Sequence, residues 1–318
     1  MTAISAMERT MLGQPDALAR ILADDGSVDA AAERIRGRRV WLVGTGTSWH
    51  AASLGAFWLR VARLDAIAVQ AADAALYGPP AAKDEAVIVI SHRGTKAYTS
   101  RVLDDARAQG VPSVLISRIG MAGADLETVE SEISSAHTAS YTGSLLRLAQ
   151  LAVALGADLG PLADVPAAVA AAMRGPSPAL PPPERSLEYV GAGPNQWTAA
   201  EGALKVRETA YVAAAGYSFE QFLHGPSVSL GDKDALVCLD GGGPGSERLR
   251  EIATAAERSG IRVHRFAENA LGEPLSVFPL TVVVQRVALE CAAALGTDPD
   301  SFGLDRPGHR ETWGAIAL

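Results

Sequence analysis

The chain has 318 residues, 48% of them hydrophobic and 20% charged, and a formal net charge of −8. This length exceeds one ordinary core and predicts two domains of about 150 residues each. The acidic charge, without any basic stripe, argues against a nucleic-acid surface.

Residues 1–35 are polar and helical in pattern, and we expect an N-terminal helical arm there. The opening MTAISAMERTM lacks the basic flank and apolar core of a signal peptide. Cys238 and Cys291 both lie in apolar runs, as buried thiols of a reducing compartment do. We therefore expect a cytoplasmic protein.

A strand then leads into the turn Gly44-Thr45-Gly46-Thr47-Ser48 and a helix. Glycines allow close approach of the backbone, and a helix N-terminus with the hydroxyls of Thr47 and Ser48 attracts an anion. The turn is not a dinucleotide fingerprint, because the third glycine is missing and Val69 and Gln70 end the next strand. It also lacks the lysine of a P-loop.

The following strand ends in Ser91-His92-Arg93-Gly94-Thr95-Lys96. Its hydroxyls and cations can hold a phosphate through charge-assisted hydrogen bonds. Either turn alone fits a plain helix cap. Two such turns at neighbouring strand ends predict a phosphate pocket.

The chain contains the same pattern twice. Three pairs of segments match about 150 residues apart: 43–57 with 190–204, 86–91 with 235–240, and 110–116 with 260–266. The pattern predicts two α/β domains, each a doubly wound parallel sheet flanked by helices. We place them at residues 36–174 and 185–300, joined by a proline-rich linker (175–184) and followed by a tail (301–318). In the second copy Asp240 stands at the second turn and would repel a phosphate.

The segment 201–226, EGALKVRETAYVAAAGYSFEQFLHGP, carries the strongest functional signal. Glu201, Lys205 and Glu208 share one helix face, and His224 follows on a loop. A solvated, salt-bridged face is the plain interpretation of these three residues. The small and apolar residues between them, such as Ala203 and Val206, favour burial instead. For His224 a structural hydrogen bond to the backbone is the alternative.

The apolar stretch 280–296 is interrupted by Gln285, Arg286 and Glu290, so we expect a packed helix and no membrane span. The six histidines are scattered, and no HxxxH or CxxC pair occurs, so no metal site is expected.

These motifs resemble the sugar isomerase (SIS) family, in the double-SIS form of the isomerase half of glucosamine-6-phosphate synthases. LVGTGTSWHAA and VISHRGTK resemble its two phosphate turns, and SEISSAHTASYTG (131–143) its sugar-contacting segment. EGALKVRETAY followed by HGP resembles its most specific signature. The resemblance implies two flavodoxin-like SIS domains and a phosphorylated-sugar site.

The resemblance also implies a role for each matching residue. Glu208 would be the base that moves a proton between C1 and C2 through an enediol, and His224, from the partner subunit of a homodimer, would assist ring opening. Glu201 and Lys205 would position and polarise the substrate's hydroxyls. The phosphate and sugar would contact residues of the turns and of the sugar-contacting segment: Gly46, Thr47, Ser48, Ser91, His92, Arg93, Thr95, Lys96, Ser135 and His137.

The sequence departs from the family at several positions. Arg93 and Lys96 replace a serine and a threonine, so they can hold the same phosphate more tightly or accept a second anionic group. His137 and Ala139 replace a serine and a lysine, and no lysine follows Lys233, so the family's tail lysine is missing. No glutaminase domain or N-terminal cysteine is present, so we do not expect a complete synthase.

We expect an aldose–ketose isomerase acting on a hexose phosphate or amino-sugar phosphate, without a cofactor. Two alternatives stay open. One is an amino-sugar-phosphate deaminase or fructosamine-phosphate deglycase. The other is a non-catalytic sugar-phosphate sensor or accessory subunit.

Overall fold

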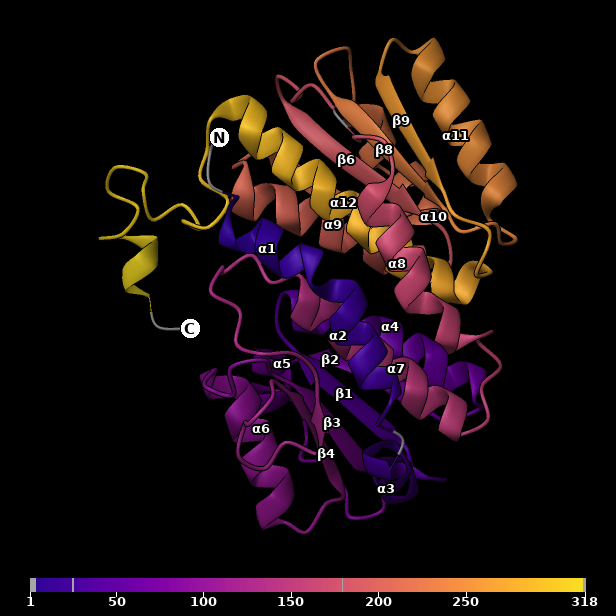
Figure 1. Ribbon diagram of the computed structural model, residues 1–318, viewed down its shortest axis with the longest axis vertical. Helices are drawn as coiled ribbons and strands as arrows, with labels where there is room; N and C mark the ends of the chain where they lie inside the picture. The colour runs from indigo at the N-terminus through magenta and orange to yellow at the C-terminus, as the bar shows by residue number, and fades with distance from the viewer. Residues whose placement is uncertain (1–3, 25, 179, 317–318) are drawn as a thin grey trace. The chain divides into compact units, whose positions relative to one another are not determined.

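The computed structural model describes residues 4–24, 26–178 and 180–316, which form two compact units. We call them the N-terminal unit (residues 13–132 and 139–166) and the C-terminal unit (residues 4–12, 133–138 and 167–316). Each unit is a parallel sheet with helices on both faces (Figure 1). The N-terminal arm expected over residues 1–35 is divided between the two units.

The sheet of the N-terminal unit has the strand order β2-β1-β3-β4-β5 and is parallel throughout. Its strands are β1 (Val40–Gly44), β2 (Ala66–Gln70), β3 (Ala86–Ile90), β4 (Ser113–Ser117) and β5 (Leu126–Glu127). Every residue of β3 and β4 is buried, as expected for strands covered on both faces. The chain order reverses between β1 and β3, which makes their carboxyl ends the switch point where such sheets bind ligands.

Helices cover both faces of this sheet. Against one face pack α5 and α6, and on the other lie α2, α3, α4 and α7 (Figure 1). Their bounds are α2 (Gln14–Leu22), α3 (Gly26–Ile35), α4 (Thr47–Val61), α5 (Ala71–Leu76), α6 (Ala97–Ala108) and α7 (Ala139–Ala154), with a 3-10 turn η1 at Leu162–Asp164. The buried guanidinium of Arg147, on α7, donates to the carboxylate and carbonyl of Asp24 at 2.8 and 3.2 Å, and this ties the α2–α3 segment to the unit.

The sheet of the C-terminal unit has the order β7-β6-β8-β9, again parallel. Its strands are β6 (Ser186–Gly191), β7 (Ala213–Ser218), β8 (Ala235–Asp240) and β9 (Arg262–Ala267). This order repeats that of the first four strands of the N-terminal unit. A Cβ built on Gly44 would lie 2.4 Å from the Ser48 carbonyl oxygen, and one on Gly191 would lie 2.1 Å from that of Asn195. The two first turns thus need glycine for the same reason.

On one face of the second sheet α9 and α12 pack together with α1, and on the other lie α10 and α11. The bounds are α1 (Ala6–Leu12), α8 (Val165–Arg174), α9 (Asn195–Thr209), α10 (Phe219–Leu223), α11 (Ser246–Arg258) and α12 (Glu273–Leu295), with 3-10 turns η2 (Pro226–Ser229) and η3 (Trp313–Ala315). Cys238 and Cys291 are free and buried, as predicted.

By length and composition α12 could cross a membrane, but 67% of its most apolar window is buried inside the protein. Core helices of globular proteins have this property too, and α12 packs closely on α9. A Cβ on Gly202 of α9 would lie 2.9 Å from both Val284 of α12 and Tyr189 of β6. The structure therefore supports the packed helix predicted from the polar residues within it.

Candidate active site

The first candidate turn lies at the carboxyl end of β1. Gly46 has a φ of +57°, which favours glycine, and α4 begins at the next residue, Thr47. Gly44 lies against the first turn of α4, where any side chain would collide with backbone. Thr47 and Ser48 are partly exposed at this helix N-terminus. The local geometry therefore has the form of the anion turn predicted from the sequence.

The second candidate turn follows β3 and is held by hydroxyl groups. The Ser117 hydroxyl donates to the Ser91 carbonyl at 2.7 Å, and the Ser100 hydroxyl donates to the Gly94 carbonyl at 3.1 Å. Gly94 has a φ of +64° and reverses the chain. Because β1 and β3 pair directly, with Val43 opposite Val89, the two turns emerge side by side at the switch point. Ser91 is buried there, whereas Arg93 and Thr95 are exposed.

The imidazole of His92 is hydrogen-bonded within the N-terminal unit. Its Nε2 accepts a hydrogen bond from the backbone N–H of Glu132 at 3.1 Å. The buried carboxylate of Glu132 in turn accepts from the N–H of Ser140, in the first turn of α7, at 2.7 Å. No local sequence pattern pointed to this role of Glu132. His92 thus joins the second turn to the chain that leads into α7.

In the C-terminal unit, α9 carries a buried row of three charged groups. The Lys205 ammonium lies 2.5 Å from Glu208 Oε2 and 3.4 Å from Glu201 Oε1. The side chains of Glu201 and Lys205 are fully buried, and that of Glu208 is 13% exposed. The prediction of one shared helix face is confirmed, and the solvated ion-pair interpretation is wrong because the apolar neighbours enclose the row.

Burial raises the pKa of Glu208, and the negative charge of Glu201 adds to this, while Lys205 acts in the opposite direction. Burial by itself would lower the pKa of Lys205, but the two carboxylates outweigh it and raise that pKa. Lys205 therefore stays cationic, and Glu208 is a stronger base than an exposed carboxylate. The charge of His137 has a smaller effect that favours ionised Glu208.

The segment that contains Ser135 and His137 is anchored within the C-terminal unit. The side-chain amide of Gln285, on α12, donates to the Thr138 carbonyl at 3.5 Å, and Ala136 is part of the hydrophobic core. The N–H of His137 donates to the Ser135 carbonyl at 3.1 Å, which tightens the segment. Both predicted sugar-contacting side chains are partly exposed.

His224 ends α10, and its side chain is 71% exposed. Its Nε2 lies 3.1 Å from Glu220 Oε1, one helical turn earlier. The imidazole therefore forms a surface pair with a side chain, and the alternative of a structural bond to the backbone is not what the structure describes.

The switch point of the second sheet is occupied by a side chain of the protein itself. The Glu273 carboxylate would lie 3.0 Å from a Cβ on Gly193 and 2.0 Å from one on Gly243, so it contacts both glycine turns. Asp240 accepts from the N–H of Gly242 at 2.9 Å beside it. Burial and then Asp240 raise the pKa of Glu273. Two carboxylates here disfavour a phosphate, which agrees with the prediction that only the first copy binds the anion.

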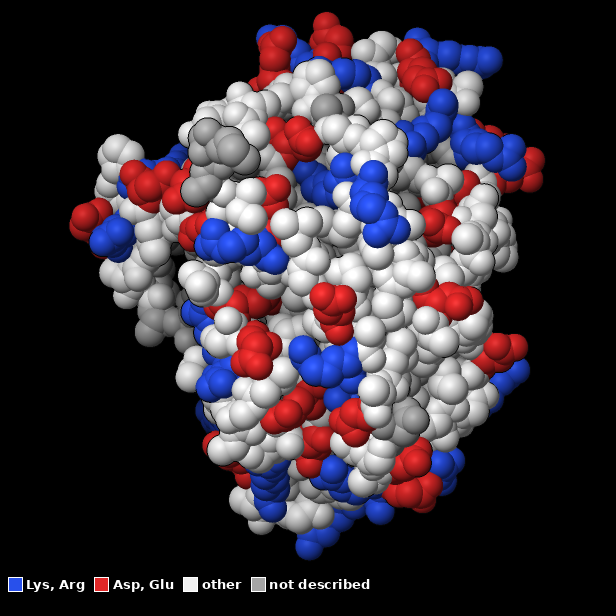
Figure 2. All heavy atoms as spheres, viewed as in Figure 1, with Lys and Arg blue, Asp and Glu red and all other residues white. Residues whose placement is uncertain are grey.

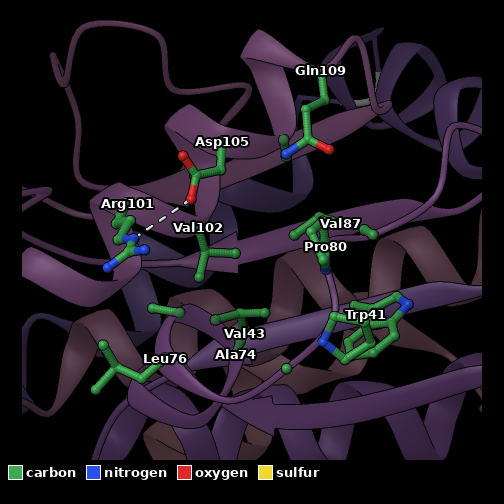
Figure 3. Close-up of a pocket in the computed structure, with 15 residues that line it drawn as sticks. Trp41, Val43, Ala74, Leu76, Pro80, Val87, Arg101, Val102, Asp105 and Gln109 are labelled. Atoms are coloured by element: carbon green, nitrogen blue, oxygen red, sulfur yellow. Dashed lines mark ion pairs between the residues drawn. The ribbon is translucent and has the colours of Figure 1, made fainter.

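A cavity of about 290 Å³ lies between α5 and α6 in the N-terminal unit (Figure 3). Most of the residues that line it are of apolar type, with Trp41 of β1 on one side and the Arg101–Asp105 ion pair of α6 on the other. None of the predicted site residues lines it, so it carries no argument for the reaction. On the face shown in Figure 2, Lys and Arg alternate with Asp and Glu and form no continuous basic band.

Comparison with known proteins gives a match to one domain family. Residues 35–154 match the SIS domain. The match covers the first sheet and the whole of α7, and it includes both candidate phosphate turns. The expectation of two SIS domains is supported for one domain only, because the second sheet lies outside the matched SIS region.

The chain is also similar to part of a longer enzyme. It is 28% identical over 309 residues to the isomerizing glutamine–fructose-6-phosphate aminotransferase of Zymomonas mobilis, with 83% of this chain and 50% of that enzyme covered. The chain thus spans about half the length of this relative.

Solved structures share the fold. The C-terminal domain of glucosamine-fructose-6-phosphate aminotransferase from Francisella tularensis aligns with a TM-score of 0.80 and 19% identity, over 94% of this chain and 99% of that one. Glucosamine-6-phosphate deaminase from Thermotoga maritima aligns with a TM-score of 0.75 and 18% identity, over 93% and 97%. The chain therefore shares the fold of these two structures over nearly its whole length.

Proposed function

We propose that this protein binds a phosphorylated sugar or amino sugar and isomerises it between its aldose and ketose forms. The observation that carries the proposal is the buried row Glu201–Lys205–Glu208 on α9. Removal of a proton next to a carbonyl needs a base in a water-poor site and a cation near the developing oxyanion. Glu208, with its raised pKa, and Lys205 supply these two groups.

In the proposed reaction Glu208 removes the proton from C2 of the open-chain aldose. The C–H electron pair forms the C1–C2 double bond, and the carbonyl electrons move to O1, which takes up a proton. Glu208 then returns its proton to C1, while the O2–H proton leaves and C2 becomes the ketose carbonyl. No atom is gained or lost, and Glu201 keeps Lys205 charged beside the oxyanion.

The substrate's phosphate is assigned to the two turns of the SIS domain. Their donors are Gly46, Thr47, Ser48, Ser91, Thr95 and Lys96, with Ser135 and His137 contacting the sugar. The contact of His92 with Glu132 supports a positioning role for His92, in place of the direct phosphate contact expected from the sequence.

A homodimer in the cytoplasm, with His224 supplied by the partner subunit for ring opening, is part of the proposal. Its support is that His224 is 71% exposed and lies between exposed apolar side chains, Leu223 at 42% and Val228 at 86%. Exposed apolar side chains beside a functional histidine favour an interface.

A deaminase or deglycase is the second candidate, because it uses the same enediol chemistry and releases ammonia or an amine. The cations Arg93 and Lys96 favour it, since an amino-acid conjugate carries a carboxylate as well as a phosphate. A non-catalytic sensor or accessory subunit has less support, because it would not need a buried base of raised pKa.

Thermal shift measurements with fructose 6-phosphate, glucose 6-phosphate, glucosamine 6-phosphate and unphosphorylated glucose test the proposal. We expect at least one phosphate ester to raise the melting temperature of the wild type, and no effect of glucose. The Lys96→Ala variant should reduce the shift. Equal shifts with glucose and its 6-phosphate would contradict a phosphate site.

A further inference from the structure

Two cations on the second turn of the SIS domain have no side-chain partner among the described residues. Among residues 4–24, 26–178 and 180–316, no side chain forms an ion pair or hydrogen bond with the guanidinium of Arg93 or the ammonium of Lys96. The next arginine in the chain differs, because Arg101 on α6 pairs with Asp105 at 3.6 Å. The two unpaired cations are therefore available to a ligand.

The two charges act on each other. Burial lowers the pKa of Lys96, and the positive charge of Arg93 lowers it further. The backbone that carries them is held in place, since the Thr99 hydroxyl donates to the Lys96 carbonyl at 2.9 Å and the Ser100 hydroxyl to the Gly94 carbonyl at 3.1 Å. Two like charges on one turn make it attractive to an anion.

The surroundings of the two cations differ. Lys96 is partly buried and directly precedes α6, on the same turn as the buried Ser91. Arg93 is exposed, and it precedes Gly94, where the chain reverses. The proposed phosphate site uses Lys96 together with the hydroxyls of Ser91, Thr47 and Ser48. Arg93 is not needed for this phosphate, and its planar guanidinium, with two parallel N–H donors, suits a carboxylate or a second phosphate.

We propose that the substrate is a sugar phosphate with a second anionic group, which Arg93 binds while Lys96 serves the phosphate. This inference rests on the proposed function and narrows its substrate class. It also gives Arg93 and Lys96 unequal roles, so variants of the two residues should differ in which ligands they bind more weakly.

Isothermal titration calorimetry on the whole protein at fixed ionic strength tests the proposal with two matched ligand pairs. Glucose 6-phosphate and 6-phosphogluconate differ at C1, where the latter has a carboxylate. Fructose 6-phosphate and fructose 1,6-bisphosphate differ by a second phosphate. We expect the wild type to bind the doubly anionic member of at least one pair roughly tenfold or more tightly. The pair that shows the gain identifies the second group as a carboxylate or a phosphate.

The variants R93S and K96T keep a hydroxyl donor but remove the charge. R93S should abolish the gain and change binding of the singly phosphorylated sugar by less than about threefold. K96T should weaken both members of the pair by a similar factor. The double variant K83T/R101S removes the same two side-chain types elsewhere in this unit and should preserve the gain. Because Arg93 is exposed, melting temperatures of R93S and the wild type should agree, and R93K should retain part of the gain if R93S does not fold.

Equal binding of both members by the wild type would overturn the inference, and so would equal weakening of both members by R93S. Either result would leave the proposed phosphate site intact. If the wild type bound none of the four ligands, the phosphate site itself would be refuted together with the inference.

Discussion

The Lys205 ammonium lies 2.5 Å from Glu208 Oε2, and both groups are buried in α9. Glu201 lies on the other side of the ammonium at 3.4 Å. One cation thus serves two carboxylates, so the row carries a net negative charge when all three groups are ionised. The same arrangement that keeps Lys205 charged leaves Glu208 with a raised pKa.

Replacement of Lys205 by methionine should destabilise the C-terminal unit. Two buried carboxylates would lose their cation, and removing one partner of a buried ion pair typically costs about 3–5 kcal/mol. The free energy of unfolding from urea titration measures this. The control is Lys233→Met, whose pair with Glu184 is 65% and 73% exposed and should contribute less than about 1 kcal/mol. Equal losses in both variants would contradict the burial of the row.

Gly44→Ala should abolish phosphate binding. The added Cβ would meet the Ser48 carbonyl oxygen at 2.4 Å, so β1 or the first turn of α4 must move. The control is Gly26→Ala, where a Cβ meets nothing within 4 Å and the φ does not require glycine. Titration with inorganic phosphate, together with the melting temperature, measures both effects. Unchanged phosphate affinity in a folded Gly44→Ala protein would remove this turn from the site.

Much of the site was predictable from local sequence. The glycine turns follow from backbone contacts a few residues apart, and the shared face of Glu201, Lys205 and Glu208 follows from helical spacing. The burial of that face could only be inferred from apolar neighbours. Glu273 at the second switch point was not predictable, because it is far along the chain from Gly193.

The hydrogen bond that His92 accepts was likewise not predictable from the sequence, because its donor is the backbone N–H of Glu132, 40 residues further on. Contacts between distant segments are set by packing, and a single sequence has no local signal for them. That no described side chain pairs with Arg93 or Lys96 could be learned only from the structure. A carboxylate near either cation would have formed an ion pair with it inside the protein.

The stability of the C-terminal unit should fall in acid through Asp234. This buried carboxylate pairs with Arg185 and accepts from the N–H groups of Ser186 and Gly231. The bond from Arg185 is the main cause that lowers the pKa of Asp234 from 3.8 to about 2.

Because the folded pKa lies below the ordinary value, Asp234 contributes its full stabilisation above about pH 5 and loses it progressively as the pH falls from there to below about 2. The shift corresponds to about 2 kcal/mol. Urea unfolding between pH 5 and pH 3 should show a smaller decline for Asp234→Asn than for the wild type. Parallel declines would contradict the assignment.

If His224 acts across a dimer, two inactive variants should restore each other. Glu208→Gln and His224→Ala would each be inactive alone, but a mixed dimer has one site with both native residues. Unfolding and refolding the two proteins together should therefore return part of the isomerase activity. A mixture of Glu208→Gln with Lys205→Met should recover no isomerase activity, because both changes lie on α9 and every site would keep one of them. A lack of recovery in the first mixture would assign His224 to the site of its own chain.

The most direct test of the account is hydrogen exchange at C2 of the substrate in deuterium oxide. With the phosphate ester selected by thermal shift, the wild type should incorporate solvent deuterium at C2 as the sugar isomerises. Glu208→Gln should bind the ester but exchange roughly 100- to 10,000-fold more slowly, and Glu251→Gln, an exposed control on α11, should match the wild type. Exchange at the wild-type rate in Glu208→Gln would contradict the role of Glu208 as the base.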